Sequence, residues 1–150
     1  MGEDVFVRIT AAAKKLNKSA DDVSARIREA EERLEKAGAG FDVEDSKYFF
    51  QKETTVTMQE DGDDVERPAD IVFDMLYTRV GARWRIASRE RTLLDTENQW
   101  ESPRVLSESV TPLLDCDRQT RIRAAERLPE FLKVIASELE SAVEKLGKLK

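Results

Sequence analysis

The strongest local signal in this sequence is a β-hairpin between Ile71 and Arg91. Gly81 and Ala82 separate two runs that are rich in β-branched and aromatic residues. A two-residue loop with glycine first is typical of a type II′ turn, whose twist matches that of the flanking strands. Such a loop fixes the register: Val80 faces Arg83, and each further pair lies one residue outward on both strands.

This register divides the hairpin into two faces, because side chains alternate along a strand. One face is apolar and is the predicted core face; it carries Ile71, Phe73, Met75, Tyr77, Trp84, Ile86 and Ser88. The opposite face carries Arg83, Arg85, Arg89 and Arg91, with one acidic residue, Asp74, opposite Arg89. A cross-strand ion pair contributes only about 0.2–1 kcal/mol. The other three guanidinium groups therefore need water, a protein partner or an anion.

Helical patterns precede and follow the hairpin. Residues 3–18 and residues 20–37 each show apolar residues at helical spacing, and Gly38 is a typical helix end. The pattern leaves open whether these residues form one helix or two that meet near Asn17. Residues 117–150 form the second helical stretch, with Asp117 as the expected N-cap.

The C-terminal stretch has the alternating three- and four-residue spacing of a coiled-coil seam. The seam consists of Ala125, Leu128, Leu132, Ile135, Leu139, Ala142, Leu146 and Leu149. Pro129 lies inside this stretch, and proline disturbs a helix interior. We therefore expect either a bend near Leu128 or a helix that begins afresh at Pro129.

The predicted fold class is α+β in a single domain over residues 1–150. It has a helix or helix pair in residues 1–38, a three-stranded antiparallel meander in residues 46–92, an irregular segment in residues 93–116 and a long helix in residues 117–150. A sheet with one apolar face needs a cover, which the two helical regions can supply. The C-terminal helix is longer than such a sheet, so we expect a homo-oligomer, most simply a dimer.

Charge is distributed unevenly along the chain. The formal net charge is −6, which argues against duplex nucleic acid as a partner. Between Arg79 and Arg127 there are ten arginines and no lysine. Arginine offers a planar fork to carboxylates and phosphates, although ordinary ion pairing is the competing interpretation because the same stretch holds eight acidic residues. The acidic residues 60–66 do not fit a calcium-binding loop, and we expect no metal site.

The residue inventory removes most catalytic chemistry. The chain has no histidine, no glycine-rich phosphate loop and one cysteine, Cys116. We therefore expect no enzyme activity and no cofactor. A chain without signal-peptide features, without an apolar run long enough to span a bilayer and without a second cysteine is expected in the cytoplasm, away from membranes.

These observations favour a non-enzymatic, oligomeric binding protein with an arginine-rich site for a small anionic, nucleotide-like ligand, which it sequesters. The candidate ligand-binding residues are Arg83, Arg85, Arg89, Arg91, Trp100, Arg104, Arg118, Arg121 and Arg123, with Trp100 or Tyr77 stacking on a base. The alternative is a coiled-coil adaptor or inhibitor that acts by protein–protein interaction. A third hypothesis, a single-stranded nucleic-acid binder, is disfavoured by the acidic balance.

Overall fold

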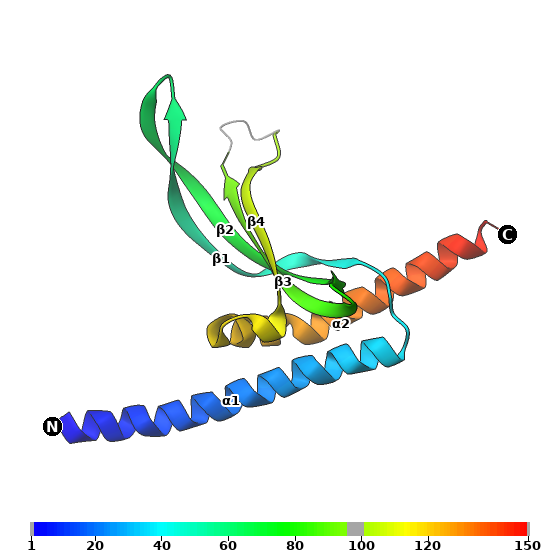
Figure 1. Ribbon diagram of the computed structural model, residues 1–150, viewed down its shortest axis with the longest axis horizontal. Coiled ribbons are helices and arrows are strands. Elements are labelled where there is room, and N and C mark those ends of the chain that lie inside the picture. Colours follow the sequence, from blue (N-terminus) through cyan, green and yellow to red (C-terminus); the bar gives the residue numbers. More distant parts are fainter. Residues whose placement is uncertain (1, 96–100, 150) are drawn as a thin grey trace.

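The computed structural model describes residues 2–95 and 101–149 (Figure 1). The elements follow the chain as α1 (Gly2–Lys36), β1 (Val43–Glu60), β2 (Asp63–Val80), β3 (Arg83–Leu94), β4 (Arg104–Pro112), the 3₁₀ turn η1 (Leu113–Asp115) and α2 (Arg118–Gly147). The predicted α+β class, with a helix on each side of an antiparallel sheet in the chain, is confirmed. The sheet has four strands and not three, with the order β1-β2-β3-β4.

The two long hairpins have tight turns that their sequences explain. The predicted register between β2 and β3 is confirmed from the Val80–Arg83 pair to the Ala69–Leu94 pair. Gly81 has a φ of +65°, as the first position of a type II′ turn requires. Asp61 and Gly62 both have positive φ, which fits a type I′ turn between β1 and β2. Most of the acidic stretch 60–66 is therefore strand, closed by a two-residue turn.

The prediction of an irregular segment at residues 93–116 is wrong. β3 continues to Leu94, and β4 pairs with it along pairs such as Arg89–Val110. β4 is an edge strand with serine and glutamate among its valines, and most of its side chains are exposed. The main-chain ladder holds it in the sheet, so its sequence carries little of the apolar alternation by which strands are recognised. The sheet also begins earlier than predicted, at Val43.

Both helices are continuous. α1 passes through Asn17 without a break and ends in a Schellman motif, in which the Ala39 and Gly38 amides donate to the carbonyls of Leu34 and Glu35, both at 3.0 Å. Gly38 has the positive φ that this motif needs, +70°. α2 begins at the predicted N-cap, whose carboxylate accepts from the Thr120 amide at 2.7 Å. Pro129 lies inside α2, and no second helix begins there.

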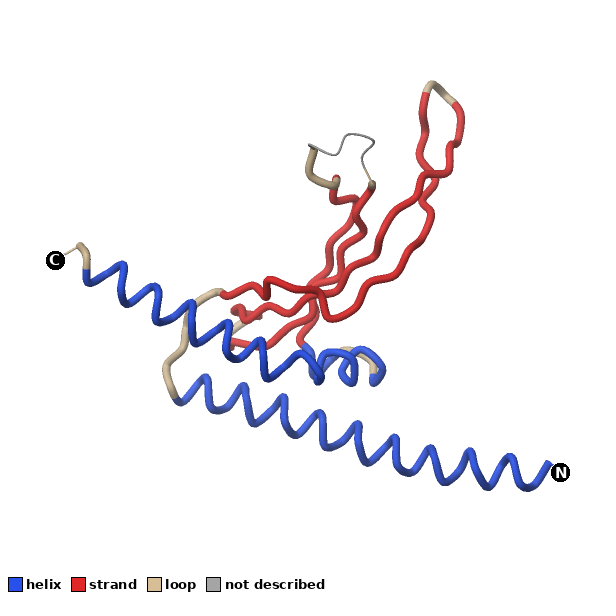
Figure 2. Tube along the Cα trace, turned by 180° about the vertical axis from the view of Figure 1, so that it is seen from behind, coloured by secondary structure: helices blue, strands red, loops and turns tan. Residues whose placement is uncertain are grey.

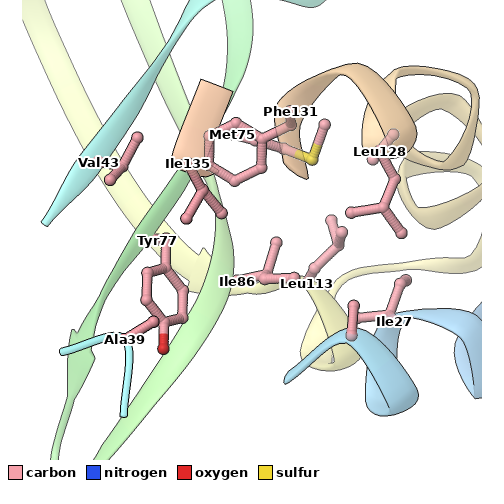
Figure 3. Close-up of a cluster of buried hydrophobic side chains, with 12 residues drawn as sticks. Ile27, Ala39, Val43, Met75, Tyr77, Ile86, Leu113, Leu128, Phe131 and Ile135 are labelled. Carbon is pink, nitrogen blue, oxygen red and sulfur yellow. The ribbon is translucent and has the colours of Figure 1, made fainter. Parts of the chain in front are cut away.

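The core lies between the predicted core face of the sheet and the two helices (Figure 3). Its side chains come from β2 and β3 (Met75, Tyr77, Ile86), from α2 (Leu128, Phe131, Ile135), from α1 (Ile27) and from η1 (Leu113). The buried residues of α2 are Ala124, Leu128, Phe131 and Ile135, so only part of the predicted seam is used, and it packs on the sheet. Leu146 and Leu149, at the far end of that seam, are 62% and 82% exposed.

The helices and hairpins extend away from this packed centre. In Figures 1 and 2 the N-terminal half of α1 and the C-terminal end of α2 project in opposite directions, and the β1–β2 turn points away from both helices. Within the described residues, no helix is long and apolar enough to cross a membrane.

Candidate functional site

Arg89, on the predicted arginine face, is held by carboxylates of the protein itself. Its Nε and Nη2 donate to the two Asp74 oxygens at 3.0 and 2.6 Å, and its Nη1 donates to Glu44 at 2.9 Å. The side chains of Arg89 and Asp74 are only 11% and 3% exposed. This geometry is a bidentate, largely buried ion pair, and it raises the pKa of Arg89 through hydrogen bonding to Asp74.

The other three arginines of this face also meet acidic partners. Arg91 Nη2 lies 3.4 Å from Asp74 Oδ2. Arg85 donates to Glu31 at 2.8 Å, and the same oxygen accepts from the Ile86 amide at 2.9 Å. Arg83 lies 3.2 Å from Glu35 in an exposed pair. The carboxylates come from α1 and β1 as well as β2, and sequence alternation could identify only the cross-strand partner, Asp74. An anion at this face would have to displace a carboxylate of the protein.

A separate pocket of about 310 Å³ lies between the opposite, helix-facing side of the sheet and the start of α2. One row of its floor runs across all four strands, because Phe50 pairs with Phe73, Phe73 with Glu90, and Glu90 with Ser109. The next row adds Ser88 and its partner Thr111. The complete lining is Phe50, Lys52, Phe73, Ser88, Glu90, Ser109, Thr111, Cys116, Asp117, Gln119, Thr120 and Arg123.

The cationic groups of this pocket are Arg123 and Lys52, and the Arg123 charge adds to the Thr120 hydrogen bonds that lower the pKa of Asp117. The Arg123 guanidinium carbon lies over the Phe50 ring, 3.6 Å from its centroid. Such a cation–π contact helps to hold the guanidinium over the ring. Arg123 and Lys52 form no ion pair with any residue in 2–95 or 101–149. Ser88 is buried, with 5% of it exposed.

Two acidic residues and a thiol complete the electrostatics of the pocket. Hydrogen bonds from Thr120 lower the pKa of Asp117, so this cap carboxylate is ionised at neutral pH. The negative charge of Asp117 lies at the N-terminus of α2, where it compensates the unpaired first amides of the helix. Burial raises the pKa of the Cys116 thiol to about 11, so the thiol is neutral at physiological pH. Glu90 lies exposed on the floor, where it offers a carboxylate acceptor.

Among the predicted site residues that the structure describes, only Arg123 lines this pocket. Arg118 donates to Asn17 of α1, and Arg121 donates to the Cys116 carbonyl, while its Nε is buried without a partner. Arg104 is exposed at the start of β4. Trp100 lies outside the described residues. The predicted alternative for base stacking, Tyr77, is 1% exposed and belongs to the core.

The remaining pocket residues were not among the predicted ones. Lys52 and Phe50 lie on β1, and the hydroxyls of Ser88, Ser109 and Thr111 lie on β3 and β4. Because β4 was not predicted, the rows that join these residues could not be assembled. One signal was present: Ser88 interrupts an otherwise apolar face of the hairpin, and a polar residue there indicates a place where the core ends.

Comparison with protein-family models, with curated proteins and with solved structures gives no match for this chain. Among the described residues, no three side chains of the metal-binding types are grouped so that they could hold a metal ion.

Proposed function

We propose that this protein is a non-enzymatic, oligomeric binding protein that sequesters a small anionic, nucleotide-like ligand. We place the ligand in the pocket at the start of α2 and not on the arginine face. Its main support is Arg123, whose guanidinium carbon lies 3.6 Å from the Phe50 ring centroid and whose charge, after the Thr120 hydrogen bonds, helps to lower the pKa of Asp117. A partly buried guanidinium with free N–H groups is suited to a phosphate or carboxylate.

The pocket offers complementary groups for the rest of such a ligand. Lys52 adds a second positive charge at the rim. The hydroxyls of Ser88, Ser109 and Thr111 can donate to phosphate oxygens or accept from sugar hydroxyls, and Glu90 can accept from a sugar hydroxyl or a base N–H. A volume of about 310 Å³ is at the lower end for ligand pockets, so a mononucleotide fits the proposal better than a larger ligand.

Calorimetric titration with purine and pyrimidine mononucleotides, and with inorganic phosphate, tests the proposal. Arg123→Gln and Lys52→Gln are each expected to weaken binding about tenfold or more, because each removes a charge-assisted contact. Arg83→Gln is the matched control: it removes the same charge from an exposed arginine whose partner is Glu35, and binding should not change. The pocket is not the site if no probe binds the wild-type protein, or if all three variants bind as the wild type does.

A second candidate is the adaptor or inhibitor that acts by protein–protein interaction, and it is supported by the end of α2. Val143, Leu146 and Leu149 are 69%, 62% and 82% exposed there. Leu146→Asp should abolish capture of a protein partner. Ser137→Asp should not, because Ser137 lies on the opposite face of α2. Equal capture by both variants would exclude this end of α2 as the recognition surface.

A further inference from the structure

One apolar stripe runs along nearly the whole length of α1. Its residues are spaced by three and four positions, so they share one face of the helix. They are Val5, Ile9, Ala12, Leu16, Ala20, Val23, Ile27, Ala30 and Leu34. The second half of this stripe is covered: Ala20, Ile27 and Ala30 are 3%, 0% and 8% exposed. The first half is not: Val5, Ile9 and Leu16 are 51%, 54% and 43% exposed.

The covered half of the stripe ends where α2 begins. Arg118, the first residue of α2, donates to Asn17 of α1. On the other side of this contact every residue from 4 to 19 is exposed. Leu16 and Ile122 line a hollow at the junction, together with the first side chains of α2. Figures 1 and 2 show the N-terminal half of α1 projecting past the start of α2. The exposed stripe is therefore a direct continuation of an interface already formed inside the chain.

The N-terminal half of α1, residues 2–18, needs a partner for physical reasons. An isolated helix of this length is only marginally stable in water, because tertiary packing supplies most of the stability of protein helices. Lys14 and Lys18 lie opposite the stripe, and Asp4, Arg8 and Lys15 lie along one flank of it. A helix with one apolar and one charged face is suited to pack by the apolar face.

We infer that a second copy of this chain covers the exposed stripe, with the two α1 helices antiparallel and a two-fold axis near Ile9. The distribution of charge selects this arrangement. Asp4 lies at one end of the segment, and Lys14 and Lys15 lie at the other. Asp4 and Lys15 lie on the same flank of the stripe, so in the antiparallel pair Asp4 of each copy lies beside Lys15 of the other. In a parallel pair Asp4 and Lys15 would lie about 16 Å apart along the seam and could not meet.

This arrangement also accounts for the hollow at the junction. With Ile9 at the axis, the first turn of each α1 lies beside Leu16 of the other copy, next to the start of α2. α2 covers the stripe from Ala20 onward, and the second copy covers it from Leu16 back to Val5. The inference rests on the oligomeric part of the proposed function, and the hollow shares Asp117, Gln119 and Arg123 with the ligand pocket.

Sedimentation velocity of three proteins tests the interface. The wild type and Val7→Asp should be dimers, and Ile9→Asp should be a monomer. Val7 is 67% exposed and lies on the charged side of α1, so it is a control with the same new charge on the same helix. Neither position belongs to the core, so both variants should keep the circular dichroism of the sheet. A monomeric wild type, or an Ile9→Asp variant that is still a dimer, overturns the inference.

Disulfide cross-linking in a Cys116→Ser background tests the antiparallel direction. Ile9→Cys places two thiols at the axis and should form a covalent dimer. Leu16→Cys places them about 21 Å apart, at 1.5 Å of rise per residue, and should not. Efficient cross-linking at both positions would indicate a parallel pair and overturn the proposal.

A different result would assign the stripe to a lipid surface instead. In that case the wild-type protein would be monomeric and would bind anionic vesicles, and this binding would be lost in Ile9→Asp but kept in Val7→Asp. Lys52→Gln changes the ligand pocket but not this hollow and should remain dimeric, so failure of the ligand proposal is distinguishable.

Discussion

Asp74 compensates the charges of two arginines inside the sheet. It forms a bidentate pair with Arg89 and a longer contact with Arg91, and its side chain is 3% exposed. Removing one partner of a buried ion pair leaves an uncompensated charge, which is more costly than losing the attraction alone. Asp74 therefore stabilises the fold mainly by compensating the charges of these arginines in the sheet.

Asp74→Ala should lower the free energy of unfolding by about 3–5 kcal/mol, as measured by urea denaturation. Glu29→Ala is the control, because Glu29 pairs with Arg33 one turn away on an exposed surface of α1. Loss of that pair should cost only about 0.3–0.5 kcal/mol. Similar losses in the two variants would show that burial does not amplify the Asp74 interaction.

Cys116 provides a prediction about pH. Burial raises its pKa to about 11, from an ordinary value of 9.0. At pH ~8 the folded protein should therefore contain roughly 100-fold less thiolate than the chain unfolded in urea, and iodoacetamide should alkylate it correspondingly slowly. As the pH rises, the unfolded chain loses the proton first, so the free energy of unfolding should fall between these two pKa values. Equal alkylation rates in the folded and unfolded protein would contradict this assignment.

The elements differ in how clearly the sequence predicts them. The β2–β3 hairpin is recognisable because Gly81 fixes the turn and the apolar alternation fixes the faces. The partners Glu31, Glu35 and Glu44 were not recognisable, because the packing of α1 and β1 brings them to the arginines. The sequence does not predict β4, because β4 is an exposed edge strand held by main-chain hydrogen bonds. The pocket is not predictable for the same reason, since Ser109 and Thr111 of β4 form part of its floor.

Two glycines at helix ends distinguish the effect of backbone conformation on stability from the effect of steric contact with a side chain. An added Cβ would meet nothing within 4 Å at Gly38 or at Gly147, but only Gly38 has a positive φ. Gly38→Ala should therefore destabilise the protein by about 1–2 kcal/mol, because it strains the end of α1. Gly147→Ala should be neutral or stabilising by a few tenths of a kcal/mol. Thermal unfolding of both variants tests this, and equal melting temperatures would contradict the Schellman end.

The whole molecule combines a packed centre with two helical projections. The centre joins half of α1, half of α2 and one face of the sheet around Phe131 and Ile27. The projections carry apolar residues that do not contact this core. Part of the apolar surface of the single chain is therefore exposed to solvent. The pocket lies at the start of α2, close to the point where the second copy is proposed to reach Leu16. The ligand and the dimer are thus proposed to meet at neighbouring parts of one helix.

Native mass spectrometry of gently purified protein tests this account most directly, because it reports subunit number and retained small molecules together. We predict a dimer that carries additional mass, either retained from purification or acquired on addition of mononucleotides. Lys52→Gln should remain a dimer and carry less of that mass, and Ile9→Asp should be a monomer. Wild-type protein that is monomeric, and that stays without additional mass when mononucleotides are supplied, would contradict the account.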